Sequence, residues 1–309
     1  MFEYRCEIDA FVSSSDGMST NNFGSDIAFP SIESEAGFLI IAHGLDFGSG
    51  FRPQLHKHRN GAGAWLTIRA GLIRMGQVNP QFESEWLASL TLELVQEYFD
   101  LSSNSEASEE LLPLANQLHS SINEMGTVLM QLGFSSPSEY LLNRLKLVNN
   151  SAVQLVQCLV DDFPLTFDDS YKLSDDTYVF FYKKAQLVVS ELFMRFVYSN
   201  VPNEQDMKQK LSFADISQLT AFVDNVVVAM MRQLNIIVCS QEIEEAINAQ
   251  IPIMKGSIEE ISLRAKALRA IEAIVRLVNE GKETPQINAQ RLCNWLWGGL
   301  GKKPENRSF

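Results

Sequence analysis

The stretch ISQLTAFVDNVVVAMMRQL, Ile216–Leu234, decides the fold. Asp215 stands directly before it, at a position where an aspartate commonly caps a helix. Hydrophobic side chains recur along the stretch every three or four residues, as on one face of an α-helix: Ile216, Leu219, Val223, Val227, Met230 and Leu234. The pattern predicts a helix from Ile216 to Leu234 that buries this face.

Helical spacing also governs the neighbouring segments. DTYVFFYKKAQLVVSELFMRFVYS opens with a strand-like run, Tyr178–Tyr182, but its stronger period is helical and starts at Phe181. Ser257 and Glu260 form a capping box, which predicts a helix to about Asn279. Strand signals are limited to roughly the first 50 residues and to Ile236–Val238. We predict a mainly α protein, a single all-helical globular domain over residues 1–309 with few or no strands.

Composition limits the classes of function. The chain has 309 residues, 46% of them hydrophobic, which is enough for a large core. Its net charge of −13 argues against binding polymeric nucleic acid but leaves room for one small phosphorylated ligand. No apolar run approaches the ~20 residues that span a bilayer. The cysteines lie far apart, as in reduced cytosolic proteins: Cys6, Cys158, Cys239 and Cys293. We expect a cytoplasmic protein without a membrane partner.

The stretch HGLDFGSGFRPQLHKHRNGAGAW, His43–Trp65, is rich in glycine and histidine. His56 and His58 could hold a metal ion, but Lys57 and Arg59 would repel it, and no further ligand motif supports it. We therefore expect no metal site and read these residues as a basic, solvent-exposed loop. A glycine turn that opens a helix can also hold an anion on free backbone N–H groups. A purely structural turn is equally compatible with the pattern.

Asp224 and the lysine pair Lys183–Lys184 each lie in apolar surroundings. An ionised carboxylate in AFVDNVVVAMM is costly unless it is paired or hydrogen-bonded. Such groups mark functional sites more often than average, although structural ion pairs do the same. In FFYKKAQLVV one amine must point close to the apolar side, unless both reach water from an amphipathic helix. Both interpretations stay open from the residues alone.

Several blocks of the sequence resemble one known family. Four blocks are similar, in order and spacing, to signatures of the queuosine salvage proteins: FPLTFDDS…VFFYKKAQLVVSELF, FADISQLTAFVDNVVVAMMRQLNIIVCSQEIEEAI, GSIEEISLRAKALRAIEAI and the closing NWLW. These are the queuosine 5′-phosphate N-glycosylase/hydrolases. The resemblance is strong over residues 143–297 and weak over residues 1–140.

The resemblance implies a fold and an activity. Members of the family are all-α proteins with a core similar to helical DNA glycosylases. They cleave the N-glycosidic bond of queuosine 5′-phosphate to give queuine and ribose 5-phosphate, which salvages queuine for tRNA modification, and they need no metal or cofactor. The family's catalytic aspartate falls on Asp224 and its lysine on Lys183, with Lys184 at the family's arginine.

These positions suit the chemistry. Breaking an N-glycosidic bond places positive charge on the sugar, which a nearby carboxylate can stabilise while it activates water. We expect His43–Trp65 to form the rim of a nucleotide pocket, with Arg52 as a plausible phosphate contact. The full set of expected substrate-binding residues is Asp46, Phe47, Phe51, Arg52, Phe222, Asp215, Lys184 and Arg264.

The sequence also departs from the family pattern. Asn225 and Val226 stand where the family has tyrosine and arginine, and Cys293 stands at a usual aspartate. GSGFRPQLHKH replaces an aromatic patch that is thought to line the base pocket, with Asp46 at an asparagine. These departures concern recognition of the base, so they bear on the substrate rather than on the reaction class. The alternatives are a hydrolase for a different nucleotide, or an altered homologue that binds a nucleotide or a protein partner.

Overall fold

The computed structural model describes residue 23 and residues 25–198 and 205–297. Contacts group the chain into two compact units, which we describe separately. The described part of unit 1 comprises Asp169–Lys183 and residues 217–297; that of unit 2 comprises residues 23, 25–168, 184–198 and 205–216. The expectation of one domain over residues 1–309 stays a prediction.

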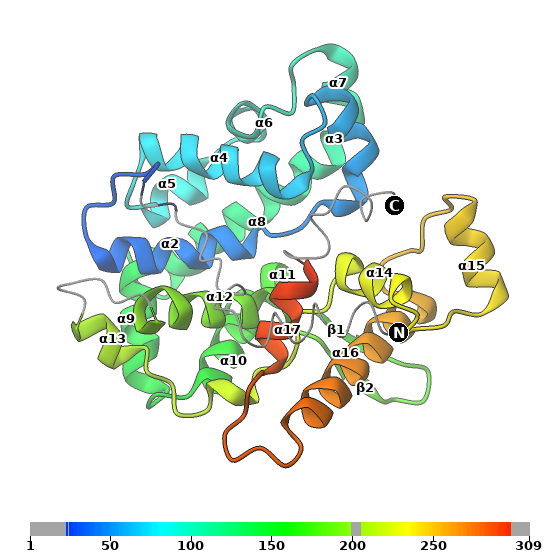
Figure 1. Ribbon diagram of the computed structural model, residues 1–309. Helices are drawn as coiled ribbons and strands as arrows, with labels where there is room; N and C mark the ends of the chain where they lie inside the picture. Colours follow the sequence, from blue (N-terminus) through cyan, green and yellow to red (C-terminus); the bar gives the residue numbers. More distant parts are fainter. Residues whose placement is uncertain (1–22, 24, 199–204, 298–309) are drawn as a thin grey trace. The chain divides into compact units, whose positions relative to one another are not determined.

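The prediction of a mainly α protein is confirmed (Figure 1). Ser31, Asn104, Ser136 and Ser151 each cap a helix of unit 2 through a side-chain oxygen. The elements of this unit are α2 (Ile32–Gly44), η1 (Ser49–Phe51), α3 (Arg52–His58), α4 (Ala64–Val78), α5 (Ser84–Ser89), α6 (Leu92–Phe99), α7 (Ser105–Glu110), α8 (Leu112–Gln131), α9 (Pro137–Leu147), α10 (Ala152–Asp162), α11 (Pro164–Phe167), most of α12 (Lys183–Phe193), η2 (Met194–Tyr198) and α13 (Gln205–Lys210).

Helix α8 is the centre of unit 2. It packs against α2, α5, α6 and α11 through an apolar stripe with helical spacing. Gly126 of α8 lies so close to α5 that a Cβ there would stand 2.3 Å from the backbone nitrogen of Ala88. Close backbone approach of this kind fixes the register of the two helices. The stripe consists of Leu114, Leu118, Ile122, Met125 and Leu129, all buried.

Unit 1 is built around one long helix. Strands β1 (Ser170–Lys172) and β2 (Tyr178–Phe180) form an antiparallel hairpin. Helix α16 (Ile258–Asn279) packs against both α14 (Asn225–Gln233) and α17 (Ala289–Trp295), while α15 (Gln241–Asn248) buries none of its residues. Ser257 caps α16 by accepting a hydrogen bond from the Glu260 amide at 3.2 Å, so the predicted helix is confirmed at both ends.

The helix predicted over Ile216–Leu234 is wrong in its first half. Only the 3₁₀ turn η3 (Ile216–Gln218) and α14 are helical, and the backbone of Asp224 between them is extended. Aspartate is a strong N-cap residue, so its side chain starts a helix here rather than continuing one. The apolar residues of the first half are still buried: Leu219, Ala221, Phe222 and Val223 are each less than 5% exposed.

The strand predictions are corrected as well. Ile236–Val238 forms no strand, and within the first 50 residues the described stretch Ile32–Gly44 is a helix; residues 1–22 and 24 lie outside the described part. The strand-like start at Tyr178 is confirmed by β2, after which α12 begins at Lys183.

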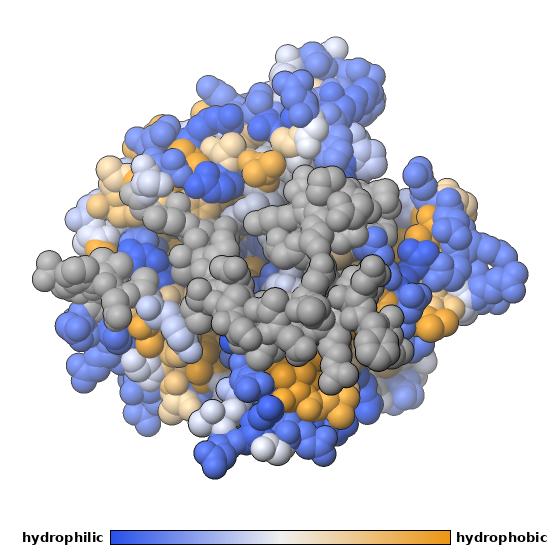
Figure 2. Space-filling model, viewed as in Figure 1, coloured by the Kyte–Doolittle hydropathy of each residue, from blue (hydrophilic) through white to orange (hydrophobic). Residues whose placement is uncertain are grey.

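Polar side chains dominate the described surface on the face shown in Figure 2, with apolar residues in small groups. Among the described residues, none of the helices is both long and apolar enough to cross a membrane.

Candidate active site

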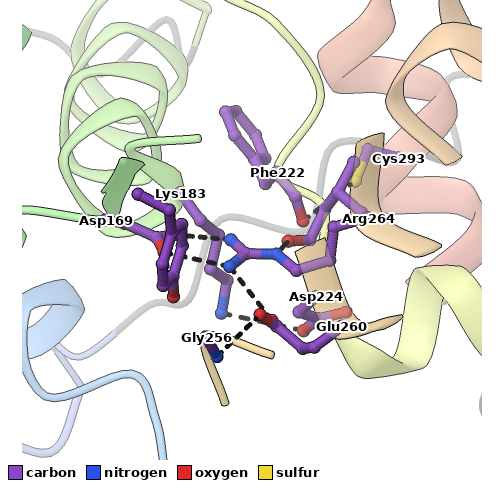
Figure 3. A network of polar contacts seen from close by, with 10 residues as sticks. Asp169, Lys183, Phe222, Asp224, Gly256, Glu260, Arg264 and Cys293 are labelled. Atoms are coloured by element: carbon purple, nitrogen blue, oxygen red, sulfur yellow. Dashed lines mark hydrogen bonds and ion pairs between the residues drawn. The ribbon is translucent and has the colours of Figure 1, made fainter. Parts of the chain in front are cut away.

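Lys183 and Asp224 form a shielded ion pair in unit 1. Their Nζ and Oδ2 atoms lie 3.7 Å apart, and each side chain is only 15% exposed (Figure 3). The two residues are 41 positions apart in the sequence, so the fold brings together the two predicted catalytic residues. This distance is longer than a hydrogen bond, so the two groups interact as an ion pair without a direct hydrogen bond between these two atoms.

Local structure places each member of the pair. Asp224 caps α14, since its Oδ1 accepts a hydrogen bond from the Val227 amide at 3.0 Å. Lys183 opens α12 and follows Tyr182, whose φ of 48° is uncommon for a residue with a bulky side chain. The helix amide and the ammonium both compensate the cost of burying the carboxylate. A fixed negative charge in such surroundings is suited to stabilise a cation.

Arg264 of α16 lies beside this pair and is buried. Its guanidinium donates to both oxygens of Asp169, at 2.9 and 2.5 Å, and to Glu260 at 3.2 Å. Nε donates to the backbone oxygen of Val223 at 3.1 Å, and the group stands 3.9 Å from the centre of the Phe181 ring. Burial alone would raise the pKa of Asp169, but Arg264 outweighs it and holds that pKa below its usual range.

Helix α17 contributes two further contacts. Cys293 Sγ lies 3.5 Å from the backbone oxygen of Phe222, and Gln290 Nε2 donates to the Leu219 oxygen at 2.5 Å. Burial raises the pKa of the Cys293 thiol to about 12, and the charge of Asp224 adds to the effect. The thiol is therefore a neutral, weak donor at physiological pH. The Phe222 side chain itself is 4% exposed.

The expected substrate-binding residues divide between the two units. Phe222 and Arg264 belong to unit 1 with the ion pair, whereas the other six belong to unit 2. In unit 2, Lys184 donates to the Gly44 oxygen at 3.1 Å and stands 5.0 Å from the centre of the Phe47 ring. Asp46, Phe51 and Arg52 are half-buried at the end of α2 and around η1.

Asp215 is used as a helix cap in unit 2. Its Oδ1 accepts from the Ala152 amide at 2.5 Å, and its Oδ2 accepts from the Ser151 hydroxyl at 2.6 Å. Both contacts lie at the N-terminus of α10, 63 or more residues away in sequence. Burial would raise the pKa of Asp215, but these hydrogen bonds lower it overall. The contacts favour a structural role for this carboxylate.

The stretch His43–Trp65 is mostly helical rather than a long loop. His43 is buried and stacks on Trp65, with ring centres 6.4 Å apart. The first and last residues of the stretch are therefore in contact. His58 is also shielded, with Nε2 2.9 Å from a Glu110 oxygen. The expectation of an exposed basic loop is therefore wrong for the backbone, which is helical, and for His58, while His56 and Lys57 are exposed as expected. Among the described residues no group of three or more His, Cys, Asp or Glu side chains could hold a metal ion.

Asp169, Glu260 and Gln290 are the site residues that sequence reasoning missed. Asp169 and Glu260 lie in the blocks FPLTFDDS and GSIEEISLRAKALRAIEAI. Each belongs to a pair of adjacent acidic residues, and this pairing could have indicated a site residue. Nothing in the sequence links Gln290 to Leu219, because a side-chain contact to a distant backbone oxygen leaves no pattern.

Comparison with known proteins places the chain in a family. The family model described as queuosine salvage protein matches residues 57–308. The queuosine 5′-phosphate N-glycosylase/hydrolase of Dictyostelium discoideum is 29% identical over 221 residues, which are 71% of this chain and 61% of that protein. The protein of the same name from Mus musculus is 25% identical over 240 residues, 76% of this chain and 65% of its own.

A bacterial relative of the same name, from Sphaerobacter thermophilus, is 27% identical over 269 residues, 86% of this chain and 76% of that protein. The chain thus spans less than two thirds of the length of the Dictyostelium and mouse proteins. The family model nevertheless covers most of the chain, including both residues of the Lys183–Asp224 pair. The chain belongs to the queuosine salvage protein family.

Proposed function

We propose that this protein hydrolyses the N-glycosidic bond of a free 5′-nucleotide, foremost queuosine 5′-phosphate. The products would be queuine and ribose 5-phosphate. The observation that carries the proposal is the shielded Lys183–Asp224 pair, with charges 3.7 Å apart, in a chain of this family. The names of the relatives, queuosine 5′-phosphate N-glycosylase/hydrolase, support the same substrate.

The proposed reaction assigns each group a step. The bond between C1′ and the base nitrogen breaks, and its electron pair leaves with the base while positive charge develops on the ribose. Asp224 stabilises this charge and accepts a proton from water as the water oxygen bonds to C1′. Lys183 donates a hydrogen bond to the departing base or to the sugar. The base takes up the proton that Asp224 accepted from the water, which restores the carboxylate. The sum is nucleotide plus water giving base plus ribose 5-phosphate.

Some of the other predicted residues would bind the substrate, whereas Asp215 and Arg264 are engaged in structural contacts. In this proposal Arg52 contacts the phosphate, because a guanidinium matches its oxygens, and Phe47 and Phe51 offer faces for a base. Lys184 lies over the Phe47 ring and gives this set a second cation. A small anionic nucleotide fits an acidic protein with a few local cations, whereas a polymeric nucleic acid does not.

The test compares the wild type with Asp224→Asn. Each protein is incubated with queuosine 5′-phosphate and the common 5′-nucleotides, and free base is measured by mass spectrometry. The amide keeps the shape and the helix cap but carries no charge, so turnover should fall on the order of 10²–10³-fold or more, with nucleotide affinity preserved. Wild-type release by the folded variant would show that Asp224 is a structural carboxylate.

A binding function is the second candidate. Asn225, Val226 and Cys293 stand where the family has tyrosine, arginine and aspartate, so part of the charged set is missing. A homologue that had lost catalysis would bind a nucleotide without releasing its base in the same assay. Release from a nucleotide other than queuosine 5′-phosphate would instead indicate a hydrolase of altered base specificity.

A further inference from the structure

The segment Leu219–Asp224 is held by side chains rather than by helical hydrogen bonds. Three of its backbone oxygens receive contacts from neighbouring helices: Val223 from Arg264 of α16, and Phe222 and Leu219 from Cys293 and Gln290 of α17. This segment ends at Asp224. The position of the carboxylate therefore depends on groups that never touch it.

The same guanidinium also holds the segment that carries Lys183. Arg264 stands over the ring of Phe181, two residues before Lys183. It also binds both oxygens of Asp169 (Figure 3). The Phe181 amide in turn donates to the Asp169 backbone oxygen at 3.0 Å. One side chain thus contacts both chain segments whose ends form the ion pair.

We propose that Arg264 is a positioning residue that sets the separation of Lys183 and Asp224, and that it is not a substrate contact. Four of its five N–H groups are engaged by Asp169, Glu260 and the Val223 oxygen. A planar fork can hold a carboxylate and a backbone oxygen in one geometry, which a lysine ammonium cannot. The effect on catalysis rests on the proposed function; the effect on the ion pair does not.

The decisive test is a double-mutant cycle on thermal stability. Lys183→Met, Asp224→Asn and the double variant are made in the wild type and in Arg264→Lys. In the wild type the two shifts in melting temperature should be non-additive, because the charges interact. In Arg264→Lys they should become additive within error, because the segments no longer hold the two groups together.

Arg232→Lys provides the matched control. Arg232 makes the same kind of two-pronged contact, to Glu244 at 2.8 and 2.5 Å, but it joins the end of α14 to α15 and touches neither segment. In the Arg232→Lys background, the melting-temperature shifts of Lys183→Met and Asp224→Asn should be as non-additive as in the wild type. Full non-additivity in Arg264→Lys, or its loss in Arg232→Lys as well, would overturn the proposal.

Kinetics give a second readout. A displacement of about 1 Å in a catalytic group can cost on the order of 10²-fold, so Arg264→Lys should lower kcat by about 10- to 100-fold while KM changes by less than about 3-fold. A raised KM with unchanged kcat would identify Arg264 as a substrate contact. If the wild type releases no base from any nucleotide, the proposed function fails while the stability cycle still decides the positioning role.

Asp169→Asn covers the case in which Arg264→Lys does not fold. The amide keeps the shape and one acceptor but loosens the guanidinium. The same cycle in this background should show a reduced coupling between Lys183 and Asp224. Coupling equal to that of the wild type in this background would reject the positioning role.

Discussion

At the scale of single residues, we expect Asp224 and Lys183 to contribute unequally to stability. Asparagine caps a helix about as well as aspartate, so Asp224→Asn keeps the bond to the Val227 amide and removes a shielded charge. Lys183→Met removes the cation beside the Asp224 carboxylate, which then keeps the hydrogen bond from the Val227 amide. We expect Lys183→Met to cost about 1–3 kcal/mol and Asp224→Asn clearly less. Chemical denaturation of both variants measures this; equal losses would contradict it.

Cys293 should be the least reactive of the described cysteines. It is fully shielded and its pKa is raised to about 12, while Cys158 and Cys239 are half-buried and have more modestly raised pKa values. Alkylation requires the thiolate, so at pH 8 iodoacetamide should label Cys293 only after denaturation. Timed labelling with peptide mass spectrometry follows each site. Early labelling of Cys293 in the native protein would show that α17 opens readily.

The family resemblance identified the lysine and aspartate, but physical reasoning from the sequence could not predict their pairing. Asp224 was visible as a carboxylate in an apolar run, which predicts that it needs a partner but not which one. The partner lies 41 residues earlier, and the Arg264 cluster that holds both segments combines side chains with backbone oxygens. Contacts of this type depend on tertiary structure and produce no periodic pattern.

At the scale of elements, Asp215 connects the loop before η3 to the start of α10. If its role is to cap that helix, Asp215→Ala should cost about 1–2 kcal/mol, because two amides and the Ser151 hydroxyl lose their acceptor. Nucleotide affinity and turnover should stay within about 2-fold of the wild type. Denaturation and equilibrium binding measure the two effects. A large loss of affinity with unchanged stability would return Asp215 to the substrate site.

Helices were predicted best where capping and periodicity agreed. The helix that begins after Ser257 has both signals and was found with its predicted ends. In Ile216–Leu234 the apolar spacing continued through a segment that is buried without being helical, and the capping signal of Asp224 was hidden within it. Periodicity reports which side chains are buried; it does not report which donors satisfy the backbone.

At the scale of the whole molecule, the mainly α class followed from the sequence, and the family model supports the resemblance over most of the chain. The similarity of the core to helical DNA glycosylases stays a prediction. The hairpin strand β1 was not expected, because three residues are too few to show an alternating pattern. Contacts group the chain into two compact units, and no linker of biased composition marks their boundaries in the sequence.

The response of the molecule to acid depends in part on Asp169 and Asp215, two described carboxylates with structural contacts, one in each unit. The pKa values of Asp169 and Asp215 are lowered in the folded state, so the stability that they contribute is present above the unfolded value of about 4 and is lost as the pH falls through the folded values. We expect the melting temperature to change little between about pH 7 and pH 5 from this source and to fall below about pH 4.

The variant Asp169→Asn separates this contribution from general acid unfolding. At pH 7 it should melt at a lower temperature than the wild type, because Arg264 loses a charged partner while it remains buried. Below about pH 3 the difference should shrink, since the wild-type carboxylate is then protonated as well. Melting curves of both proteins from pH 7 to pH 2.5 test this. Parallel curves with a constant offset would show that Asp169 stays ionised throughout, or that its charge does not stabilise the fold.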